Sequence, residues 1–274
     1  MNLRPVSPAQ PRAVGAAKLT LRAAPSGRTG IADLRQSGAL KLVFPRQLTD
    51  GAETILVNTA GGITGGDRYD LDITVEENAA LSLTTQAAER AYRAQRGETG
   101  RVTTRITVQS GAQMNWLPQE LILFERCALN RRLSVDLHGD ARLLMVEPVV
   151  FGRAAMKEVL HDIHFHDRIS VTRDGCPLYL DAMKISGDAA ARLSRPAIAN
   201  KAGAMASVLC VAPDISADLA AVRDLLPATA GASLIAPDTL VIRQLAQDSF
   251  MLRRSLMPLL EHLSQSPLPA SWRL

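Results

Sequence analysis

Cysteine is scarce in this sequence. The 274 residues include three, Cys127, Cys176 and Cys210, which lie far apart and form no CxxC pair. This spacing argues against a structural zinc site of the usual kind, and so few thiols in so long a chain argue against a disulfide framework. We therefore expect a protein of the reducing cytoplasm.

Aromatic residues and long apolar runs are also rare. Only 4% of the residues are aromatic although 47% are hydrophobic, so aliphatic side chains must fill the core. No stretch approaches the roughly 18 apolar residues of a membrane-spanning helix, and we expect no membrane span. The first 16 residues contain three prolines and no apolar run that is typical of a signal peptide. We predict a disordered lead over 1–16 and a single domain over 17–274.

Clusters of positive charge are missing. The chain has 31 basic and 27 acidic residues, a net charge of +4, and no run of five Lys or Arg. A nucleic-acid-binding protein usually gathers its basic residues into a stripe. The charge distribution therefore favours a protein or a small ion as the partner.

Short segments with an apolar residue at every second position dominate residues 18–186. Three clear ones are 69–75, 102–108 and 129–137. A period of two residues places apolar groups on one face and predicts half-buried strands. Glycine-containing turns separate the segments, and no alternation of strands with helices is seen. The sequence predicts a mainly β protein.

The last third of the chain has a different pattern. Apolar residues recur at helical spacing over 215–226, after Asp214 as the predicted N-cap, and again over 252–263. Residues 239–246 between them read as a strand. Pro258 is expected to kink or shorten the second helix. No internal repeat of fixed period is present, so the sequence does not indicate a regular solenoid.

A glycine-rich segment occupies residues 58–68 (NTAGGITGGDR). Gly61 and Gly66 have the spacing of a phosphate-binding loop, but Asp67 follows where such a loop needs Lys, and an acid there would repel a triphosphate. Two interpretations remain: a tight hairpin between two strands, or a functional surface made of backbone.

Four segments carry a resemblance to one known family. They are GGITGGDRYDLDI at 61–73, Thr84–Thr85 with AERAYRA at 88–94, WLPQELILFERC at 116–127, and EPVVFGRAAMKE at 147–158. In this order they resemble the segments of the UreD (UreH) family of urease accessory proteins. Residues 58–60 depart from the family pattern, and Lys157 stands where many members have Gly.

The resemblance implies both a fold and a function. It implies a β-helix-like, strand-rich body with a small C-terminal helical element. It also implies a non-enzymatic, chaperone-like protein that binds the accessory protein UreF and the GTPase UreG and docks onto apo-urease. Such a protein offers a water-filled internal route for Ni²⁺ and binds no cofactor tightly.

Candidate site residues follow from the matched segments. A route needs weak, spaced ligands, and carboxylates meet this need better than a His/Cys cluster. Asp67 and Glu147 are therefore the candidates for transient nickel contact, with a hydrogen-bonded or surface carboxylate as the alternative for each. The candidate partner contacts are Gly61, Gly62, Gly65, Gly66, Trp116, Pro118 and Gln119. For the last three, the alternative is an internal corner that ends a strand.

Three further possibilities are open. His161, His164 and His166 lie in HDIHFHD, and a strand would bring His164 and His166 to one face with Asp162, as a transition metal requires. Cys127 is either a soft ligand or a core residue. A β-scaffold hydrolase or lyase would use a carboxylate pair such as Asp67 and Glu120, although no GxSxG or HExxH motif is present.

Overall fold

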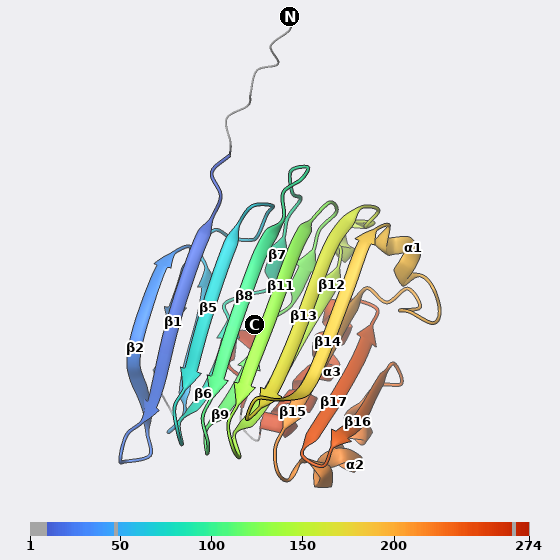
Figure 1. Cartoon of the computed structure of the whole chain (residues 1–274). Helices are drawn as coiled ribbons and strands as arrows, with labels where there is room; N and C mark the ends of the chain where they lie inside the picture. The colour runs from blue at the N-terminus through green and yellow to red at the C-terminus, as the bar shows by residue number, and fades with distance from the viewer. Residues whose placement is uncertain (1–9, 47–48, 265–266, 274) are drawn as a thin grey trace, which may run out of the picture.

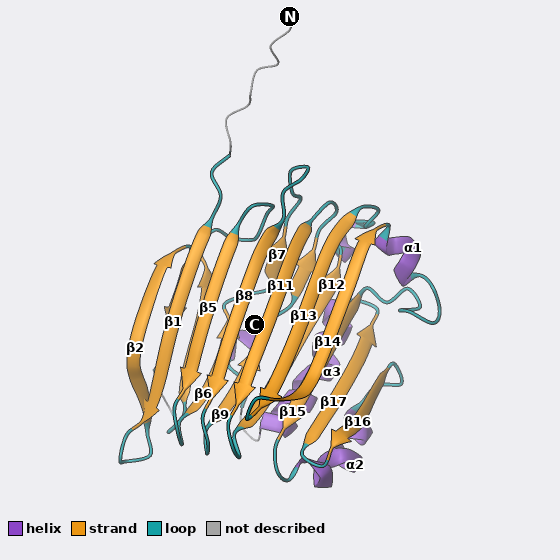
Figure 2. Cartoon of the chain, in the orientation of Figure 1, coloured by secondary structure: helices purple, strands orange, loops and turns teal. Residues whose placement is uncertain are grey.

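Two stacked β-sheets and a few short helices form the chain (Figures 1 and 2). The computed structural model describes residues 10–46, 49–264 and 267–273. Residues 1–9 of the predicted lead lie outside the described residues. Residues 14–16, which the sequence placed in the lead, belong to the first strand.

The first sheet, sheet A, faces the viewer in Figure 1. Its order is β14-β13-β11-β8-β5-β1-β2. The strands are β1 (Val14–Ala23), β2 (Thr29–Gly38), β5 (Arg68–Val75), β8 (Gly100–Val108), β11 (Ala128–Leu137), β13 (Ile163–Arg173) and β14 (Cys176–Gly187). The run from β1 to β13 is parallel, and an antiparallel strand closes it at each edge.

The second sheet, sheet B, lies behind the first. Its order is β16-β17-β15-β12-β9-β6-β4-β3, with β10 beside β12 and β7 beside β10. The strands are β3 (Leu40–Val43), β4 (Ala52–Asn58), β6 (Ala80–Thr85), β7 (Glu89–Ala91), β9 (Gln113–Leu117), β10 (Leu121–Leu123), β12 (Arg142–Phe151), β15 (Ala204–Val211), β16 (Ala230–Ala236) and β17 (Thr239–Ala246). Strands β4, β6, β9 and β12 are parallel.

The chain alternates between the two sheets and so winds as a solenoid. It passes from β5 to β6, from β8 to β9 and from β11 to β12, and each turn stacks on the one before. Val75, Val108 and Leu137 are therefore neighbours in successive turns. The mainly β, β-helix-like fold expected from the sequence is confirmed.

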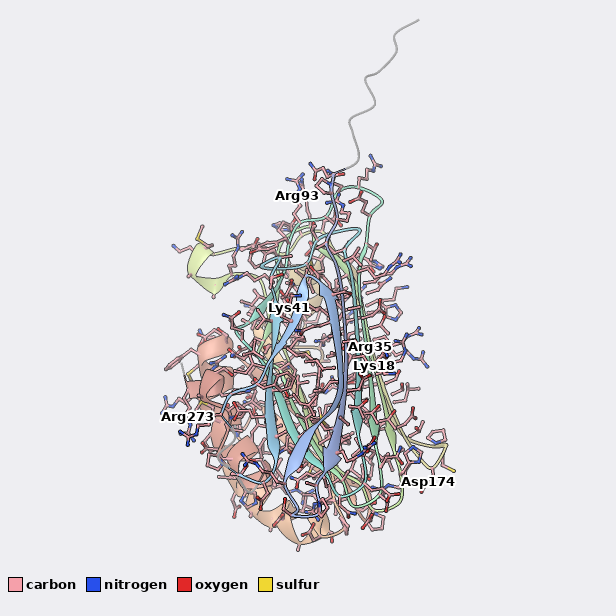
Figure 3. All side chains as sticks on the ribbon, turned by 90° about the vertical axis from the view of Figure 1, so that its left-hand side faces the viewer. Lys18, Arg35, Lys41, Arg93, Asp174 and Arg273 are labelled. Atoms are coloured by element: carbon pink, nitrogen blue, oxygen red, sulfur yellow. The ribbon has the colours of Figure 1, made fainter. Side chains whose placement is uncertain are left out.

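The main core lies between the sheets, and alternation along each strand explains it. Strand β5 buries Tyr69, Leu71, Ile73 and Val75 while its intervening residues face outward. A flat apolar face of this kind is stable only when a second layer covers it. Figure 3, a view turned by 90°, shows the sheets edge on with the helices on one side.

A second core lies between sheet B and two of the helices, α2 (Ile215–Leu225) and α3 (Ser249–Ser264). Helix α1 (Ala189–Leu193) packs on the main core, and two short 3₁₀ turns, η1 (Ala154–Met156) and η2 (Ala270–Arg273), complete the elements. Helix α2 packs on β16 and β17, and helix α3 packs on β15 and β17. Every residue of β15 is buried, because one face meets each core.

Three sequence predictions in this region can be compared with the structure. Asp214 precedes α2 as predicted, but its carboxylate pairs with Arg142, 2.9 Å away, and caps no backbone amide. Helix α3 continues through Pro258 and is therefore not shortened by it. The strand predicted at 239–246 is β17. No helix in the described part of the chain has the length and apolar character needed to cross a membrane.

Candidate functional site

The glycine-rich segment connects β4 of sheet B to β5 of sheet A. These strands do not pair with each other, so the hairpin interpretation was wrong. The segment runs instead beside β7: the Ile63 amide donates to Arg90 O at 2.7 Å, and the Tyr92 amide donates to Ile63 O at 2.7 Å. The first two motif segments are thus one structural unit at the upper end of Figure 1.

Asp67 holds this loop together. Its Oδ1 accepts a hydrogen bond from the Ala13 amide and its Oδ2 accepts one from the Thr64 amide, both at 2.8 Å. The side chain is buried. Since both carboxylate oxygens are engaged by backbone donors, the loop conformation explains why an acid stands at this position.

Two of the glycines are required by close packing. A β-carbon on Gly62 would lie 2.2 Å from the ring of Tyr92, and one on Gly65 would lie 2.8 Å from Cβ of Ala94. Both glycines are buried, whereas Gly61 and Gly66 are exposed and have positive φ. Of the four candidate contact glycines, a partner can therefore reach Gly61 and Gly66.

The third and fourth motif segments join this end through Phe124. The Tyr92 ring meets it edge-on at a centroid distance of 5.0 Å, and the Arg153 guanidinium lies 4.3 Å from its centroid. Arg153 also forms a double hydrogen bond with Glu158, which lowers the pKa of that carboxyl. Segments distant in the sequence thus share one cluster.

The WLPQE segment is an internal corner. Trp116 and Leu117 end β9, and they are buried together with Pro118, Gln119 and Glu120. In the isolated chain Trp116, Pro118 and Gln119 are therefore not exposed to a partner, and their role as partner contacts stays a prediction. Pro118 is tolerated because it follows the last residue of the strand.

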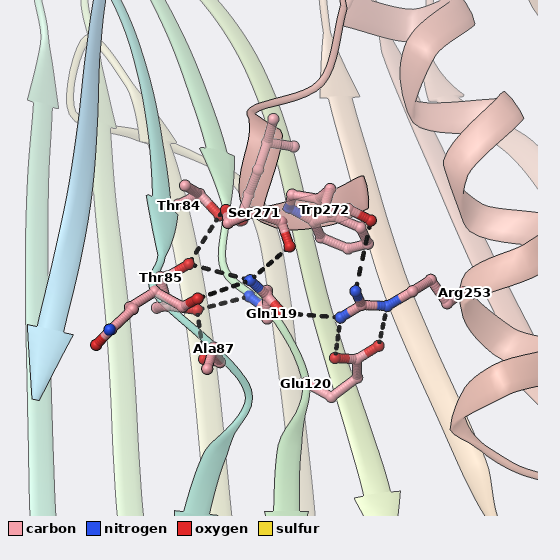
Figure 4. Close-up of polar contacts among 10 residues, drawn as sticks. Thr84, Thr85, Ala87, Gln119, Glu120, Arg253, Ser271 and Trp272 are labelled. Carbon is pink, nitrogen blue, oxygen red and sulfur yellow. Dashed lines mark hydrogen bonds and ion pairs between the residues drawn. The ribbon is translucent and has the colours of Figure 1, made fainter. Parts of the chain in front are cut away.

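A clasp of polar contacts fixes this corner to the C-terminal segment (Figure 4). The Gln119 amide group donates to the backbone oxygen of Ser271 at 3.0 Å, and Trp272 Nε1 donates to Leu117 O at 2.9 Å. Arg253 of α3 binds both oxygens of Glu120, at 3.0 and 2.7 Å. Glu120 is therefore engaged in an ion pair.

This arrangement also bears on the carboxylate pair of the hydrolase alternative. Glu120 belongs to the clasp, whereas Asp67 belongs to the glycine-rich loop, and the two share no hydrogen-bonding partner among the described residues. The structure gives the paired-carboxylate mechanism no support.

Between the sheets lies a cavity of about 200 Å³, which opens to the surface beside the exposed Gly61 and Arg90. Its wall includes the carboxyl groups of Glu89, which is half-buried, and Glu147, which is buried, and Asn58, Tyr69 and Trp116 are among the other lining residues. Burial raises the pKa of Glu89, although Asn58 Nδ2 donates a hydrogen bond to its Oε2 at 3.0 Å. Burial also raises the pKa of Tyr69 to about 12.

Three charged side chains meet at one side of this cavity. Arg131 of β11 and Asp167 of β13 are direct neighbours in sheet A, and Glu147 comes from β12 of sheet B. Arg131 Nη1 lies 2.6 Å from Glu147 Oε2, and its Nη2 lies 2.6 Å from Asp167 Oδ2. Trp116 Nε1 donates to Glu147 Oε1 at 2.6 Å. Burial raises the pKa of Glu147, and the positive charge of Arg131 opposes that rise.

A second, much smaller cavity lies on the other side of this group. It has a volume of about 10 Å³, and its lining residues include Glu147, Asp167 and Asp181. A space of this size can hold about one water molecule. Asp181 of β14 in turn pairs with Arg243 of β17 at 2.6 Å. Carboxylates therefore follow one another from the first cavity towards the β14 edge.

Of the two predicted nickel contacts, only Glu147 lines a described cavity. Asp67 lies in the glycine-rich loop and borders neither of the two. The sequence reasoning missed Glu89, Arg131 and Asp167. For Arg131 and Asp167 a signal existed, since each occupies an inward-facing position in a strand whose other inward residues are apolar.

The remaining metal candidates are not brought together. His164 and His166 share the outer face of β13, as expected for a strand, but within the described residues no group of three or more His, Cys, Asp or Glu side chains could hold a metal ion. Burial raises the pKa of Cys127 to about 12, which keeps the thiol protonated and fits a core residue.

The fold and site define a class: a β-solenoid protein with a carboxylate-lined interior. Sequence comparison matches residues 14–273 to the family described as UreD urease accessory protein. The chain is 48% identical over 275 residues to urease accessory protein UreD of Roseobacter denitrificans, with both chains fully covered. It is 53% identical over 241 residues to urease accessory protein UreD of Ruegeria pomeroyi, covering 88% of this chain and 94% of that one.

A more distant relative agrees. Urease accessory protein UreD of Brucella suis is 41% identical over 252 residues, with 90% of each chain covered. The chain belongs to the UreD family of urease accessory proteins. The family expected from the four motif segments is thereby confirmed.

Proposed function

We propose that this chain is a non-catalytic scaffold for urease maturation in the cytoplasm. It holds a UreF-like accessory protein and a UreG-like GTPase on apo-urease, and its interior guides nickel, the cargo, towards the urease metallocentre. Membership of the UreD family and the names of the similar proteins support the link to urease.

One observation carries the nickel route: Glu147, buried and fixed by Trp116, lines both of these cavities. Carboxylates bind divalent cations through oxygen, and few carboxylates per position bind them weakly. Weak binding at successive positions lets an ion pass, whereas a closed site would hold it. Glu89 at the first cavity and Asp181 at the second extend the same series.

The test of the route is Glu147→Gln in cells that express urease with its accessory proteins. We expect less nickel per urease and lower urease activity, with unchanged co-purification of the accessory proteins. Asp72→Asn, which changes an exposed carboxylate on the outer face of β5, is the matched control. Full metallation with Glu147→Gln would remove Glu147 from the route.

Asp67 remains a proposed nickel contact and is tested in the same way. Its two oxygens bind backbone amides, so we expect Asp67→Asn to reduce the amount of folded chain. If folded chain is obtained in normal amount and nickel delivery falls, Asp67 belongs to the route.

Partner contact is proposed at the motif-bearing end, through the exposed Gly61 and Gly66. Hydrogen exchange of the chain with and without the UreF-like protein tests this directly. We expect the amides around these two residues to become protected only in the complex. Unchanged exchange there, with protection elsewhere, would place the contact on another surface. Complete urease maturation in cells lacking this chain would refute the scaffold role itself.

A further inference from the structure

The charges of the buried group at the cavity wall do not balance. Glu147 and Asp167 provide two carboxylates and Arg131 provides one guanidinium, and all three side chains are largely buried, with side-chain exposures of 4, 6 and 15%. Placing an uncompensated negative charge in a protein interior is costly. While both acids are ionised, the group therefore carries one more negative charge than Arg131 can neutralise.

The guanidinium contacts the two acids in different ways. Its Nε and Nη2 form a fork with Asp167, with hydrogen bonds of 2.9 and 2.6 Å. Glu147 Oε2 lies 2.6 Å from Nη1, yet no donor among the described residues is aligned to give that oxygen a hydrogen bond. Glu147 is 4% exposed. A buried carboxylate oxygen thus faces the group without a proper hydrogen bond.

The position of the group is also unusual for a structural ion pair. Arg131 lines the larger cavity, Asp167 lines the smaller one, and Glu147 lines both. The three side chains therefore lie between the two cavities. The larger space offers room into which the arginine side chain can move.

We propose that Glu147 and Asp167 form a binding site for a divalent cation, and that Arg131 is the internal counter-cation that occupies this site when no metal is present. The inference deepens the proposed nickel route, on which it rests for the identity of the ion. A doubly charged ion would neutralise both carboxylates, which the single charge of Arg131 does not.

Arg131 and the ion compete for the same two carboxylates, and this competition keeps metal binding weak. An ion entering from the larger cavity must displace the guanidinium from Glu147 and Asp167. The lost ion pairs oppose metal binding, so the affinity stays low. When the ion leaves, Arg131 returns, and the site does not trap the cargo.

The test is nickel retention by the purified full-length chain in equilibrium dialysis against Ni²⁺. Arg131→Met removes the counter-cation and keeps a side chain of similar length. We expect this variant to retain about one Ni²⁺ per chain under conditions in which the wild type retains none, because two buried carboxylates then lack a cation. Arg168→Met, on the exposed face of β13, is the control and should behave as wild type.

Second substitutions locate the ligands. Retention should be lost in Arg131→Met combined with Glu147→Gln, and equally in Arg131→Met combined with Asp167→Asn. Retention that survives both combinations would show that the ion binds elsewhere, and a folded Arg131→Met chain that retains no more Ni²⁺ than wild type would overturn the proposal.

Arg131→Lys covers the case in which Arg131→Met does not fold. Lysine keeps the charge but cannot fork across two carboxylates, so retention should lie between those of the wild type and a metal-saturated chain. Retention equal to wild type would then overturn the proposal.

The outcome is separable from that of the nickel route. If Arg131→Met holds Ni²⁺ but Glu147→Gln matures urease normally, the site exists and the route is wrong. If Glu147→Gln impairs nickel delivery but Arg131→Met holds no Ni²⁺, the route stands without this site.

Discussion

Trp116 and Glu147 join neighbouring strands of sheet B through a buried hydrogen bond, in which the indole Nε1 lies 2.6 Å from Oε1 of the carboxylate. The indole N–H can only donate, and it reaches an ionised or a neutral carboxyl in the same geometry. The hydrogen bond is stronger to the ionised form, so the contact favours ionisation. It lowers the pKa of Glu147, against the larger effect of burial.

Trp116→Phe should therefore destabilise the chain by about 2 kcal/mol in urea unfolding, as expected for a lost hydrogen bond to a charged group. Trp272→Phe is the matched control, because Trp272 also loses one indole hydrogen bond, but to the uncharged backbone oxygen of Leu117. Equal effects of the two substitutions would contradict a special role of the charge.

The ion pair between Arg253 and Glu120 should be essential to the clasp. Removing one partner leaves the other buried and unbalanced, which costs about 3 kcal/mol. We expect Arg253→Met and Glu120→Gln each to lower stability, and the double variant to lose less than the sum of the two. A double-mutant cycle in urea measures this coupling; additive losses would show that the pair contributes little.

Replacing Lys157 with glycine should stabilise the chain. Lys157 has φ of +51°, in the left-handed region, where a side chain costs about 1 kcal/mol relative to glycine. Lys157→Gly is therefore expected to raise the unfolding free energy by up to about 1 kcal/mol. Lys157→Ala keeps the β-carbon and should give no such gain, so a similar gain from both would point to the lost lysine charge.

Glu89 should make stability depend on pH. Burial raises its pKa in the folded chain, so the folded state holds the proton more tightly than the unfolded state. The contribution of this group to stability is therefore fully present below the ordinary glutamate pKa and declines as the pH rises through the folded pKa.

Replacing the carboxyl group with an amide should abolish this decline. We expect the unfolding free energy of the wild type, relative to that of Glu89→Gln, to fall as the pH rises from about pH 4. Urea unfolding at a series of pH values measures this difference. Glu158 supplies the opposite case: Arg153 lowers its pKa, so its contribution is present above the ordinary glutamate pKa and is lost as the pH falls. Parallel curves for wild type and Glu89→Gln would contradict the assignment.

Many strands of sheet A could be predicted because they bury one face. Tyr69, Leu71 and Ile73 alternate with polar residues, and β5 follows that pattern. The stacking of turns could not be predicted, because the loops between equivalent strands differ in length and leave no fixed period. The parallel pairing of Val75 with Val108 depends on contacts distant in the sequence.

The site could be predicted only in part, for a related reason. Glu147 attracts notice as an acid within an apolar run. The partners of Glu147 come from different turns: Arg131 precedes it by one strand and Asp167 follows it by one. The strand pattern predicts that these side chains face inward, since Arg131 lies between Leu129 and Leu133. No pattern along the chain predicts which inward-facing charges contact each other.

Strand β15 is covered on both sides, one by the solenoid and the other by the helical layer. The last third of the chain therefore cannot behave as an appendage that folds separately. Shortened versions ending after β14 would present the outer side of β12, with Leu144, Val146 and Val150, to water. We therefore expect fragments of this protein to be insoluble. The contributions of its parts are best separated by point substitutions in the full chain.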